Sequence, residues 1–453
     1  MLMKVKDIIK TCNGILFSGN LDLCCNNFSK DTRTINKGDI FIGIKGDKFD
    51  GNSFYQDAFN NGASACILEE SYINNIIQTD KTIIIVKNSI EALKKLAIQK
   101  LKETKIPVIA ITGSLGKTST RNMIYSIVSK KYKTLVTEKN YNNNIGLPLT
   151  ILRLKDEELI LLEMGMNHLG EIEYLSKIAK PDIAIITNIL PIHIEYLGSM
   201  ENILKAKLEI LSGLKENGAL IINNDNEYLN NIKLKNLNII TCGIENNSNY
   251  MAYDIEQNKY KVNIKGKTFC FNNHIGTKPY ILNGLLAIAT GMQLNVEIAD
   301  IQAGINEYLL TEGRLENINS KKGVNIINDS YNASAESMIN AIDFLLNQKE
   351  KRKIAILGDI NETGTYAQEI HSKVGKYIAK NNIDYLITIG NNSKYINIEA
   401  RKGMDKNNII HFETKSDAKD YIKNLLNTGD IVLVKASNGN KFIEIVDFIK
   451  EFC

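Results

Sequence analysis

The apolar positions of the chain fall into short runs separated by more polar, helix-like segments. Near the N-terminus such runs occupy residues 38–46, 65–70 and 82–87, and a helix-like segment lies at 53–63. Short apolar runs bounded by glycine and polar residues are typical of strands. They predict a small α/β domain, which we place at residues 1–88.

A second series of apolar runs is uniformly hydrophobic and has helical stretches between its members. These runs lie at residues 106–113, 158–165, 182–189, 218–226 and 237–243. Strands with this pattern are typical of a parallel sheet buried on both faces and joined by right-handed helical crossovers. We therefore expect a doubly wound sheet in a central domain at residues 89–311.

Apolar runs resume after two helical segments at 283–293 and 298–309. The later runs lie at 323–330, 353–360, 384–390 and 430–437. They alternate with helices, which predicts a C-terminal Rossmann-like α/β domain at residues 312–453. The chain is long enough for three domains of ordinary size.

Composition excludes several classes of protein. The 453 residues are 44% hydrophobic and 23% charged, and the net charge of +4 is not gathered into a basic patch, so we expect no nucleic-acid partner. No apolar run approaches the roughly 20 residues that span a bilayer, so we expect no signal peptide and no membrane segment. Seven cysteines without metal-ligand spacing favour a reducing, cytoplasmic location. Nothing indicates an obligate oligomer, and we expect a monomer.

A shortened phosphate loop follows the run at 106–113. Gly113, Ser114, Leu115, Gly116, Lys117 and Thr118 form it, and a helix-like segment begins directly after. Such a loop points backbone N–H groups and a helix N-terminus at phosphate, while the lysine adds a cation and the threonine a ligand for Mg²⁺. The alternative is a tight turn with an exposed lysine, which the strand and helix on either side make less attractive.

Two further side chains follow neighbouring predicted strands. Glu163 ends the run "LILLE", and His193 comes shortly after the run at 182–189. Ligands of open α/β sheets bind at the carboxyl ends of the strands, so both could reach the phosphate loop. Taken singly, however, Glu163 could be a solvated loop residue and His193 a structural histidine.

Lys207 occupies an unusual position for a lysine. It shares one helical face with Ile203, Ile210 and Leu214. Lys205 lies instead on the solvent-facing side, four residues from a glutamate in each direction. A buried ammonium is costly unless it is paired, neutralised or chemically changed. The alternative is a lysine whose stem lies along the core while its head reaches solvent.

Together these residues resemble the Mur ligases, ATP-dependent amide-forming enzymes of peptidoglycan precursor synthesis. The resemblance rests on "TGSLGKTS", "NILPIHIEYLGS", "AKLE", "LNGLLAIA", "EGRLE" and "NDSYNAS" and extends over nearly the whole chain. It implies three α/β domains and a reaction in which ATP phosphorylates a carboxylate before an amine displaces the phosphate. It also explains the short loop, which is the family's version.

The resemblance implies roles for individual residues. Lys117, Glu163, His193 and Lys207 would be catalytic. Two Mg²⁺ ions would be bound, one by Thr118 and Glu163, the other by His193 and by a carbamate that CO₂ forms on Lys207. The residues that would hold ATP are Gly113, Ser114, Leu115, Gly116, Lys117, Thr118, Ser119, Asn283, Arg314 and Asp329.

Longer stretches resemble those members of the family that join D-alanyl-D-alanine to UDP-N-acetylmuramoyl-tripeptide. These stretches are "INDSYNASAESM", "LGDINETG" with His371, "NYNNNIGLPLT" and "DTRTINKGDIFIGIKGDKFDGNSF". The two substrates are therefore the expected partners. The implied substrate contacts are Asp31, Thr32, Arg33, Asn140, Asn142, Asn143, Tyr331 and Asn332.

The chain also departs from these patterns, at Asn52, Asn328, Ser334 and Ala335, and it has no DNPR-type motif of the member that adds the third amino acid. Individual contacts to adenine, uridine and the dipeptide therefore stay open, as do the third residue of the tripeptide and the general base. Two rival functions are folylpolyglutamate synthesis and an ATP-sensing switch without amide chemistry. The signatures argue against the first, and Glu163, His193 and Lys207 together argue against the second.

Overall fold

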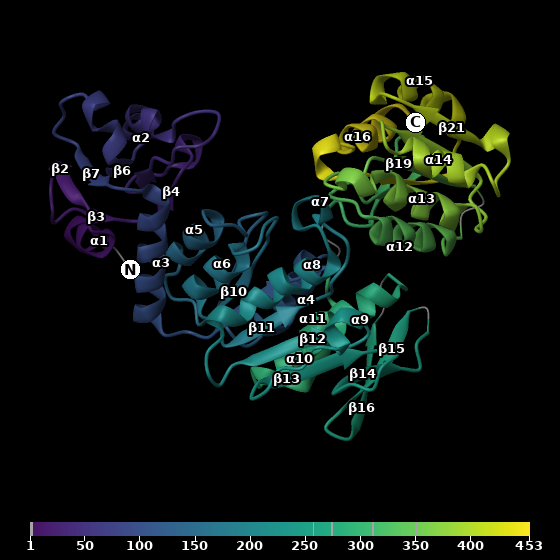
Figure 1. The fold of residues 1–453 in the computed structure, drawn as a ribbon, viewed down its shortest axis with the longest axis horizontal. Coiled ribbons are helices and arrows are strands. Elements are labelled where there is room, and N and C mark those ends of the chain that lie inside the picture. The colour runs from purple at the N-terminus through teal and green to yellow at the C-terminus, as the bar shows by residue number, and fades with distance from the viewer. Residues whose placement is uncertain (1–2, 257, 273–274, 310–311, 350–351) are drawn as a thin grey trace.

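The computed structural model describes residues 3–256, 258–272, 275–309, 312–349 and 352–453. Figure 1 shows an N-terminal part in purple and a C-terminal part in green and yellow on either side of a teal central part. Each part has its own sheet, and helices cover the sheets. The expected three-part α/β fold is confirmed. The expected boundary at residue 311 falls outside the described residues.

The N-terminal sheet has the strand order β2-β7-β6-β5-β4, and β2 alone is antiparallel to its neighbour. Its strands are β2 (Ile15–Ser18), β4 (Phe28–Ser29), β5 (Ile40–Ile42), β6 (Ala65–Glu69) and β7 (Thr82–Val86). The short strands β1 (Met3–Lys4) and β3 (Cys24–Cys25) pair separately. The helices are α1 (Val5–Cys12), α2 (Tyr55–Asn60), η1 (Thr32–Thr34), η2 (Gly51–Phe54) and η3 (Glu70–Asn75). Helix α3 (Ser89–Thr104) then leads to the central part and packs on α1 and α5.

The central sheet has the order β16-β15-β14-β13-β12-β11-β8-β10-β9 and is parallel from β14 to β9. Its strands are β8 (Val108–Thr112), β9 (Thr134–Val136), β10 (Leu159–Glu163), β11 (Ile183–Ile186), β12 (Ala219–Asn223), β13 (Asn238–Gly243), β14 (Tyr250–Tyr253), β15 (Lys259–Ile264) and β16 (Lys267–Asn272). The sequence did not predict the antiparallel hairpin β15–β16. Strand β15 has a buried residue at every second position and β16 is mostly exposed, whereas the runs that were predicted as strands are uniformly apolar.

Helices cover both faces of the central sheet. They are α4 (Lys117–Val128), α5 (Gly146–Leu152), α6 (Glu171–Ala179), α7 (Ile194–Leu197), α8 (Met200–Leu208), η4 (Glu209–Gly213), α9 (Glu227–Asn230), α10 (Lys278–Gln293) and α11 (Ile298–Asn306). Ile109 and Ile111 of β8 face the core under α4 and α10, and Val108 and Ala110 face the opposite core. Burial on both faces is why the strand is apolar throughout.

The C-terminal sheet has the order β17-β18-β22-β19-β20-β21, parallel except for β17. Its strands are β17 (Glu316–Asn319), β18 (Asn325–Asn328), β19 (Lys353–Gly358), β20 (Tyr385–Ile389), β21 (Ile409–Phe412) and β22 (Ile431–Lys435). The helices are α12 (Ala335–Leu346), η5 (Gly364–Tyr366), α13 (Ala367–Ile378), α14 (Lys394–Ala400), η6 (Lys406–Asn408), α15 (Lys415–Leu425), η7 (Asn438–Asn440) and α16 (Ile443–Phe452). None of the described helices could cross a membrane.

Candidate active site

The phosphate loop connects β8 to α4 at the middle of the central sheet. In the strand order, β8 lies between β11 and β10, where successive connections leave in opposite directions. Ligands of open α/β sheets bind at such switch points. Gly113 has a φ of 142°, and a Cβ there would lie 1.9 Å from Oγ1 of Thr187. Only glycine fits at this position.

The loop is tied to the segment that follows β11. The backbone N–H of Leu115 donates to Oδ1 of Asn188 at 2.9 Å, and the hydroxyl of Thr187 donates to the Leu115 carbonyl at 2.5 Å. The Ser114 hydroxyl bonds the backbone of Leu190. These contacts hold the loop in shape without a ligand.

Lys117 begins α4 and folds back over the loop. Its ammonium donates to the carbonyl of Gly113 at 2.7 Å and to that of Ser114 at 3.0 Å. Burial lowers the pKa of Lys117, and the Glu163 carboxylate opposes this effect. The cation is therefore held at the loop by backbone carbonyl groups.

Glu163 is buried at the end of β10, beside the end of the loop. The Thr118 hydroxyl donates to its Oε2 at 3.0 Å, and Arg121 of α4 reaches the same oxygen at 3.2 Å. The side-chain amide of Asn142 donates to its Oε1 at 3.0 Å. A paired carboxylate and hydroxyl at this edge form an oxygen ligand set of the kind that Mg²⁺ prefers.

A cavity of about 880 Å³ opens over these groups, and we call it the central cavity. It receives residues from the central and C-terminal parts. Of the residues expected at the site, those lining it are Ser114, Leu115, Gly116, Lys117, Thr118, Asn142, Asn143, Glu163, His193, Arg314, Tyr331 and Asn332. Those that do not line it are Gly113, Ser119, Asn140, Lys207, Asn283 and Asp329, together with Asp31, Thr32 and Arg33 of the N-terminal part.

Lys207 is 2% exposed and is one of the buried residues of α8, together with Ile203 and Ala206. Among the residues that the structure describes, none pairs with its ammonium. Burial, together with the nearby Lys117 cation, lowers the pKa of Lys207 well below the usual value of lysine. Its helix was expected to run to residue 214. The α-helix instead ends at Leu208 and continues as η4, where Ser176 bonds the carbonyl of Ile210.

His193 precedes α7, and Nδ1 of its ring is hydrogen-bonded to a carboxylate oxygen of Glu362. Glu362 belongs to the C-terminal part, in the loop after β19. The bond to His193 lowers the pKa of Glu362. His193 lines the central cavity, and one nitrogen of its ring is bound to a residue of the C-terminal part.

The C-terminal part also contributes a guanidinium. Arg314 donates from Nη2 to Oγ1 of Thr118 at 3.2 Å, and its guanidinium carbon lies 4.3 Å from the centre of the Tyr331 ring. Cation–π contact of this kind is favourable and fixes the arginine against the aromatic face. Arg314 thus lies where a negatively charged ligand of the loop would need a cation.

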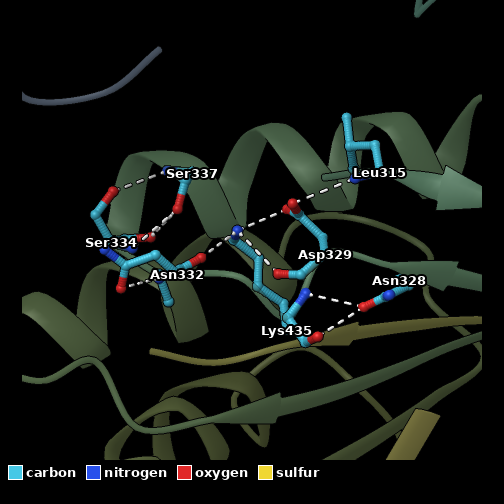
Figure 2. A network of polar contacts seen from close by, with 9 residues as sticks. Leu315, Asn328, Asp329, Asn332, Ser334, Ser337 and Lys435 are labelled. Carbon is cyan, nitrogen blue, oxygen red and sulfur yellow. Dashed lines mark hydrogen bonds and ion pairs between the residues drawn. The ribbon is translucent and has the colours of Figure 1, made fainter. Parts of the chain in front are cut away.

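Asp329 does not line the central cavity, and its carboxylate is paired with a residue of the C-terminal part. Figure 2 shows Lys435 of β22 extending to the Asp329 carboxylate, at 2.6 Å, and to the carbonyl of Asn332, at 2.9 Å. Lys435 is 2% exposed, and burial lowers its pKa although Asp329 opposes the effect. The side chain of Asp329 therefore fixes the loop that carries Tyr331 and Asn332.

Two residues that depart from the family pattern, Asn328 and Ser334, also form hydrogen bonds within the C-terminal part. Asn328 donates to Glu316 and accepts from the Ser330 hydroxyl. Ser334 begins α12 in a capping box with Ser337, which Figure 2 also shows. Such reciprocal caps stabilise the first turn of a helix.

The expected substrate residues of the N-terminal part line a second cavity of about 580 Å³. Asp31, Thr32 and Arg33 are among its polar lining residues, and Phe41 and Phe49 are among the apolar ones. Arg33 pairs with Asp31 through two bonds of 2.9 and 2.7 Å and lowers the pKa of Asp31 to about 2. A polar rim on an apolar pocket suits a ligand with a flat ring and a charged end.

The asparagines at 140–143 differ in their positions. Asn142 contacts Glu163, and Oδ1 of Asn143 accepts from the N–H of Gly146, the first residue of α5, at 2.8 Å. Asn140 is exposed outside the central cavity. Asn283 lies on α10 beside Gly116, where a Cβ on the glycine would be 2.8 Å from the asparagine Oδ1.

Profiles of three known domains match the chain. They are the Mur ligase family catalytic domain at residues 27–121, the Mur ligase middle domain at 111–291 and the Mur ligase glutamate ligase domain at 313–438. A UDP-N-acetylmuramoyl-tripeptide--D-alanyl-D-alanine ligase from Bacillus subtilis is 36% identical, over 98% of this chain and 97% of its own length. The chain belongs to the Mur ligase family. The resemblance seen in the sequence is confirmed.

Solved Mur ligases agree with this assignment. The crystal structure of MurF from Acinetobacter baumannii superposes with a TM-score of 0.89 at 27% identity, covering 99% of both chains. MurF ligase from Thermotoga maritima, solved in complex with ADP, gives a TM-score of 0.80 at 28% identity, covering 94% of this chain and 97% of its own. The full-length match extends through all three parts of this Mur ligase.

Sequence reasoning missed three residues of this Mur ligase site, namely Arg121, Glu362 and Lys435. Arg121 follows the phosphate loop by one helical turn, which could have drawn attention to it. Glu362 lies within "LGDINETG", and Lys435 ends an apolar run. Their partners, however, are 42, 169 and 106 residues away in the chain, so the sequence did not indicate the pairs.

Proposed function

We propose that this chain joins D-alanyl-D-alanine to UDP-N-acetylmuramoyl-tripeptide in peptidoglycan precursor synthesis, with ATP as the energy source. The product would be UDP-N-acetylmuramoyl-pentapeptide, with ADP and phosphate. The full-length relative from B. subtilis is named for this activity, in agreement with the four signatures. The observation that carries the proposal is the central cavity, where the phosphate loop, Glu163, His193 and Arg314 meet.

ATP would bind with its phosphates at the loop of residues 113–118. The free N–H groups at the start of α4 and the Lys117 ammonium would hold phosphate oxygens. Arg314 reaches the loop from the C-terminal part and already contacts Thr118. Phosphoryl transfer depends mainly on position and charge, which these groups supply. Asp329 would act indirectly, because Lys435 occupies its carboxylate.

Thr118 and Glu163 fit one Mg²⁺, because a hydroxyl and a carboxylate are joined at the end of the loop. Arg121, which pairs with the same carboxylate, now supplies the balancing positive charge. His193 and a carbamate on Lys207 would hold a second ion. When bound, Mg²⁺ would neutralise the charge on the phosphates. The described residues contain no group of three His, Cys, Asp or Glu side chains placed to hold a metal ion. A carbamate on Lys207 would add an anionic ligand to His193.

The surroundings of Lys207 support the carbamate. Its amine is buried, has no partner in the described part of the chain and has a lowered pKa. A neutral amine attacks the carbon of CO₂, forms an N–C bond and loses one proton to solvent. The neutral amine thereby becomes an anionic carbamate, whose charge is opposite to that of the nearby Lys117 cation.

The carboxylate of the tripeptide would receive the γ-phosphoryl group and become an acyl phosphate. The amine of D-alanyl-D-alanine would then attack the carbonyl carbon, and the C–O bond to phosphate would break as the amide forms. Asn142, Asn143, Tyr331 and Asn332 line the cavity where the peptide would lie. The second cavity, beside Asp31, Thr32 and Arg33, would hold the UDP end. A monomer in the cytoplasm stays our expectation.

The decisive experiment measures phosphate release from ATP with UDP-N-acetylmuramoyl-tripeptide, with and without D-alanyl-D-alanine. We expect release only when both are present, together with formation of the pentapeptide. Release that requires glutamate in place of the dipeptide would favour folylpolyglutamate synthesis. ATP binding without release under any of these conditions would favour a switch protein.

A further inference from the structure

His193 and Glu362 form a polar contact between the central and C-terminal parts. The contact joins Nδ1 of the imidazole to a carboxylate oxygen. An ionised carboxylate has no proton to donate, so Nδ1 must carry the proton of this hydrogen bond. The other nitrogen, Nε2, is then left with its lone pair in the neutral ring.

The loop that carries Glu362 is held by hydrogen bonds to other residues of the C-terminal part. The N–H of Ile360 donates to Nε2 of the buried His371 at 2.9 Å, and the N–H of Asn361 donates to the Ser437 hydroxyl at 2.9 Å. His371 is itself bound to the carbonyl of Ala367. Glu362 is therefore held by the C-terminal part and does not simply extend from its surface.

The backbone is unusual on both sides of the contact. His193 has a φ of 60° and Glu362 a φ of 58°, both in the left-handed region that residues other than glycine seldom adopt. Beside them, a Cβ on Gly364 would lie 3.1 Å from Cγ of Glu195, so η5 and α7 lie close together. Such conformations persist where the surroundings enforce them and are frequent at functional sites.

We propose that Glu362 is a positioning residue for His193, holding its ring as the tautomer whose Nε2 is free to bind a divalent cation. Histidines that bind metals usually donate their other N–H to a carboxylate, which fixes the ring and raises its basicity. This inference rests on the metal role of His193 proposed above. It adds that the C-terminal part completes the cation site without providing a ligand, because Glu362 belongs to that part.

The tautomer can be tested without any metal. The full chain is labelled with ¹⁵N in the rings of its five histidines. The NMR signals of the His193 ring are those that disappear in His193→Ala. We expect Nδ1 protonated and Nε2 unprotonated in the wild type. Glu362→Ala and Glu362→Gln should weaken this preference, whereas Glu369→Ala, which removes an exposed carboxylate on α13, should not. A wild-type ring protonated on Nε2 would overturn the proposal.

Mn²⁺ can test the consequence for the cation site. Binding of Mn²⁺ to the full chain with a non-hydrolysable ATP analogue is followed by electron paramagnetic resonance. We expect Glu362→Ala to weaken one of two sites by about 10- to 100-fold, Glu362→Gln to weaken it less, and Glu369→Ala to leave it unchanged. Normal binding in both Glu362 variants with a loss in His193→Ala would overturn this inference alone. Normal binding in His193→Ala would also remove the metal role of His193.

Discussion

Nη2 of Arg314 and Oγ1 of Thr118 lie 3.2 Å apart, so a guanidinium from the C-terminal part donates to the hydroxyl at the end of the phosphate loop. The same hydroxyl donates to Glu163. A cation bound between Thr118 and Glu163 and a phosphate beside it would rearrange this contact. We therefore expect nucleotide binding to be coupled to the position of the C-terminal part.

The first prediction concerns this coupling. We expect the radius of gyration from small-angle scattering to fall when an ATP analogue and UDP-N-acetylmuramoyl-tripeptide bind together, because Arg314 would follow the phosphates and exclude water from the acyl phosphate. Arg314→Ala should reduce the change, because it removes the guanidinium from the loop. An unchanged radius in the wild type would contradict closure.

The second prediction concerns Lys207. Lys207→Ala should lower the rate of phosphate release at least tenfold, the order expected when a metal site is disturbed. A short carboxylic acid in the buffer should restore part of the activity by taking the place of the carbamate. Lys205→Ala, an exposed change on the same helix, is the matched control and should keep full activity. Full activity in Lys207→Ala would refute the carbamate.

The third prediction concerns Gly113. Gly113→Ala should abolish ATP binding, measured by calorimetry, because the new Cβ would lie 1.9 Å from the Thr187 hydroxyl in a loop with a φ of 142°. The control is Gly266→Ala, at a φ of 79° with no atom within 4 Å of the new Cβ. Gly266→Ala introduces backbone strain of roughly 1 kcal/mol, but its new Cβ does not clash with another atom. Equal ATP affinity in both variants would show that the loop adapts.

The fourth prediction concerns the buried pair of Lys435 and Asp329. Lys435→Ala should lower the free energy of unfolding by about 3–5 kcal/mol, because it leaves a largely buried carboxylate without its counter-charge. Lys373→Ala breaks a pair with Glu336 in which the lysine is exposed, and it should cost less than about 1 kcal/mol. Urea unfolding of the two variants compares them. Similar losses would mean that the buried pair has little effect.

The fifth prediction concerns pH. The Arg33 guanidinium holds the pKa of Asp31 at about 2, below the usual 3.8. Because the folded pKa is the lower one, any stability from this pair is present above about pH 4 and is lost as the pH falls through 2. Arg33→Ala should raise the pKa of Asp31 towards 3.8, as measured by NMR titration of the carboxyl carbon. If the pKa of Asp31 stays near 2 in this variant, groups other than Arg33 lower it.

The sequence by itself determined which apolar runs form the buried parallel strands and where the phosphate loop lies between them. Strands β8, β10 and β11 could be predicted because parallel strands covered on both faces must be apolar at nearly every position. The spacing of Gly113, Gly116 and Lys117 after β8 indicated phosphate binding, since the chemistry is local to six residues. The burial of Lys207 followed from helical periodicity in the same way.

Only the tertiary structure decided which side chains meet. His193 contacts Glu362, Thr118 contacts Arg314, and Lys435 contacts Asp329 over separations of 169, 196 and 106 residues. Periodicity and spacing describe one element at a time. The first two pairs depend on how the C-terminal part lies against the central part, and the third depends on the pairing of β18 with β22 within one sheet. The lack of a partner for Lys207 in the described part of the chain is likewise a property of the packed core, because any distant carboxylate could have supplied one.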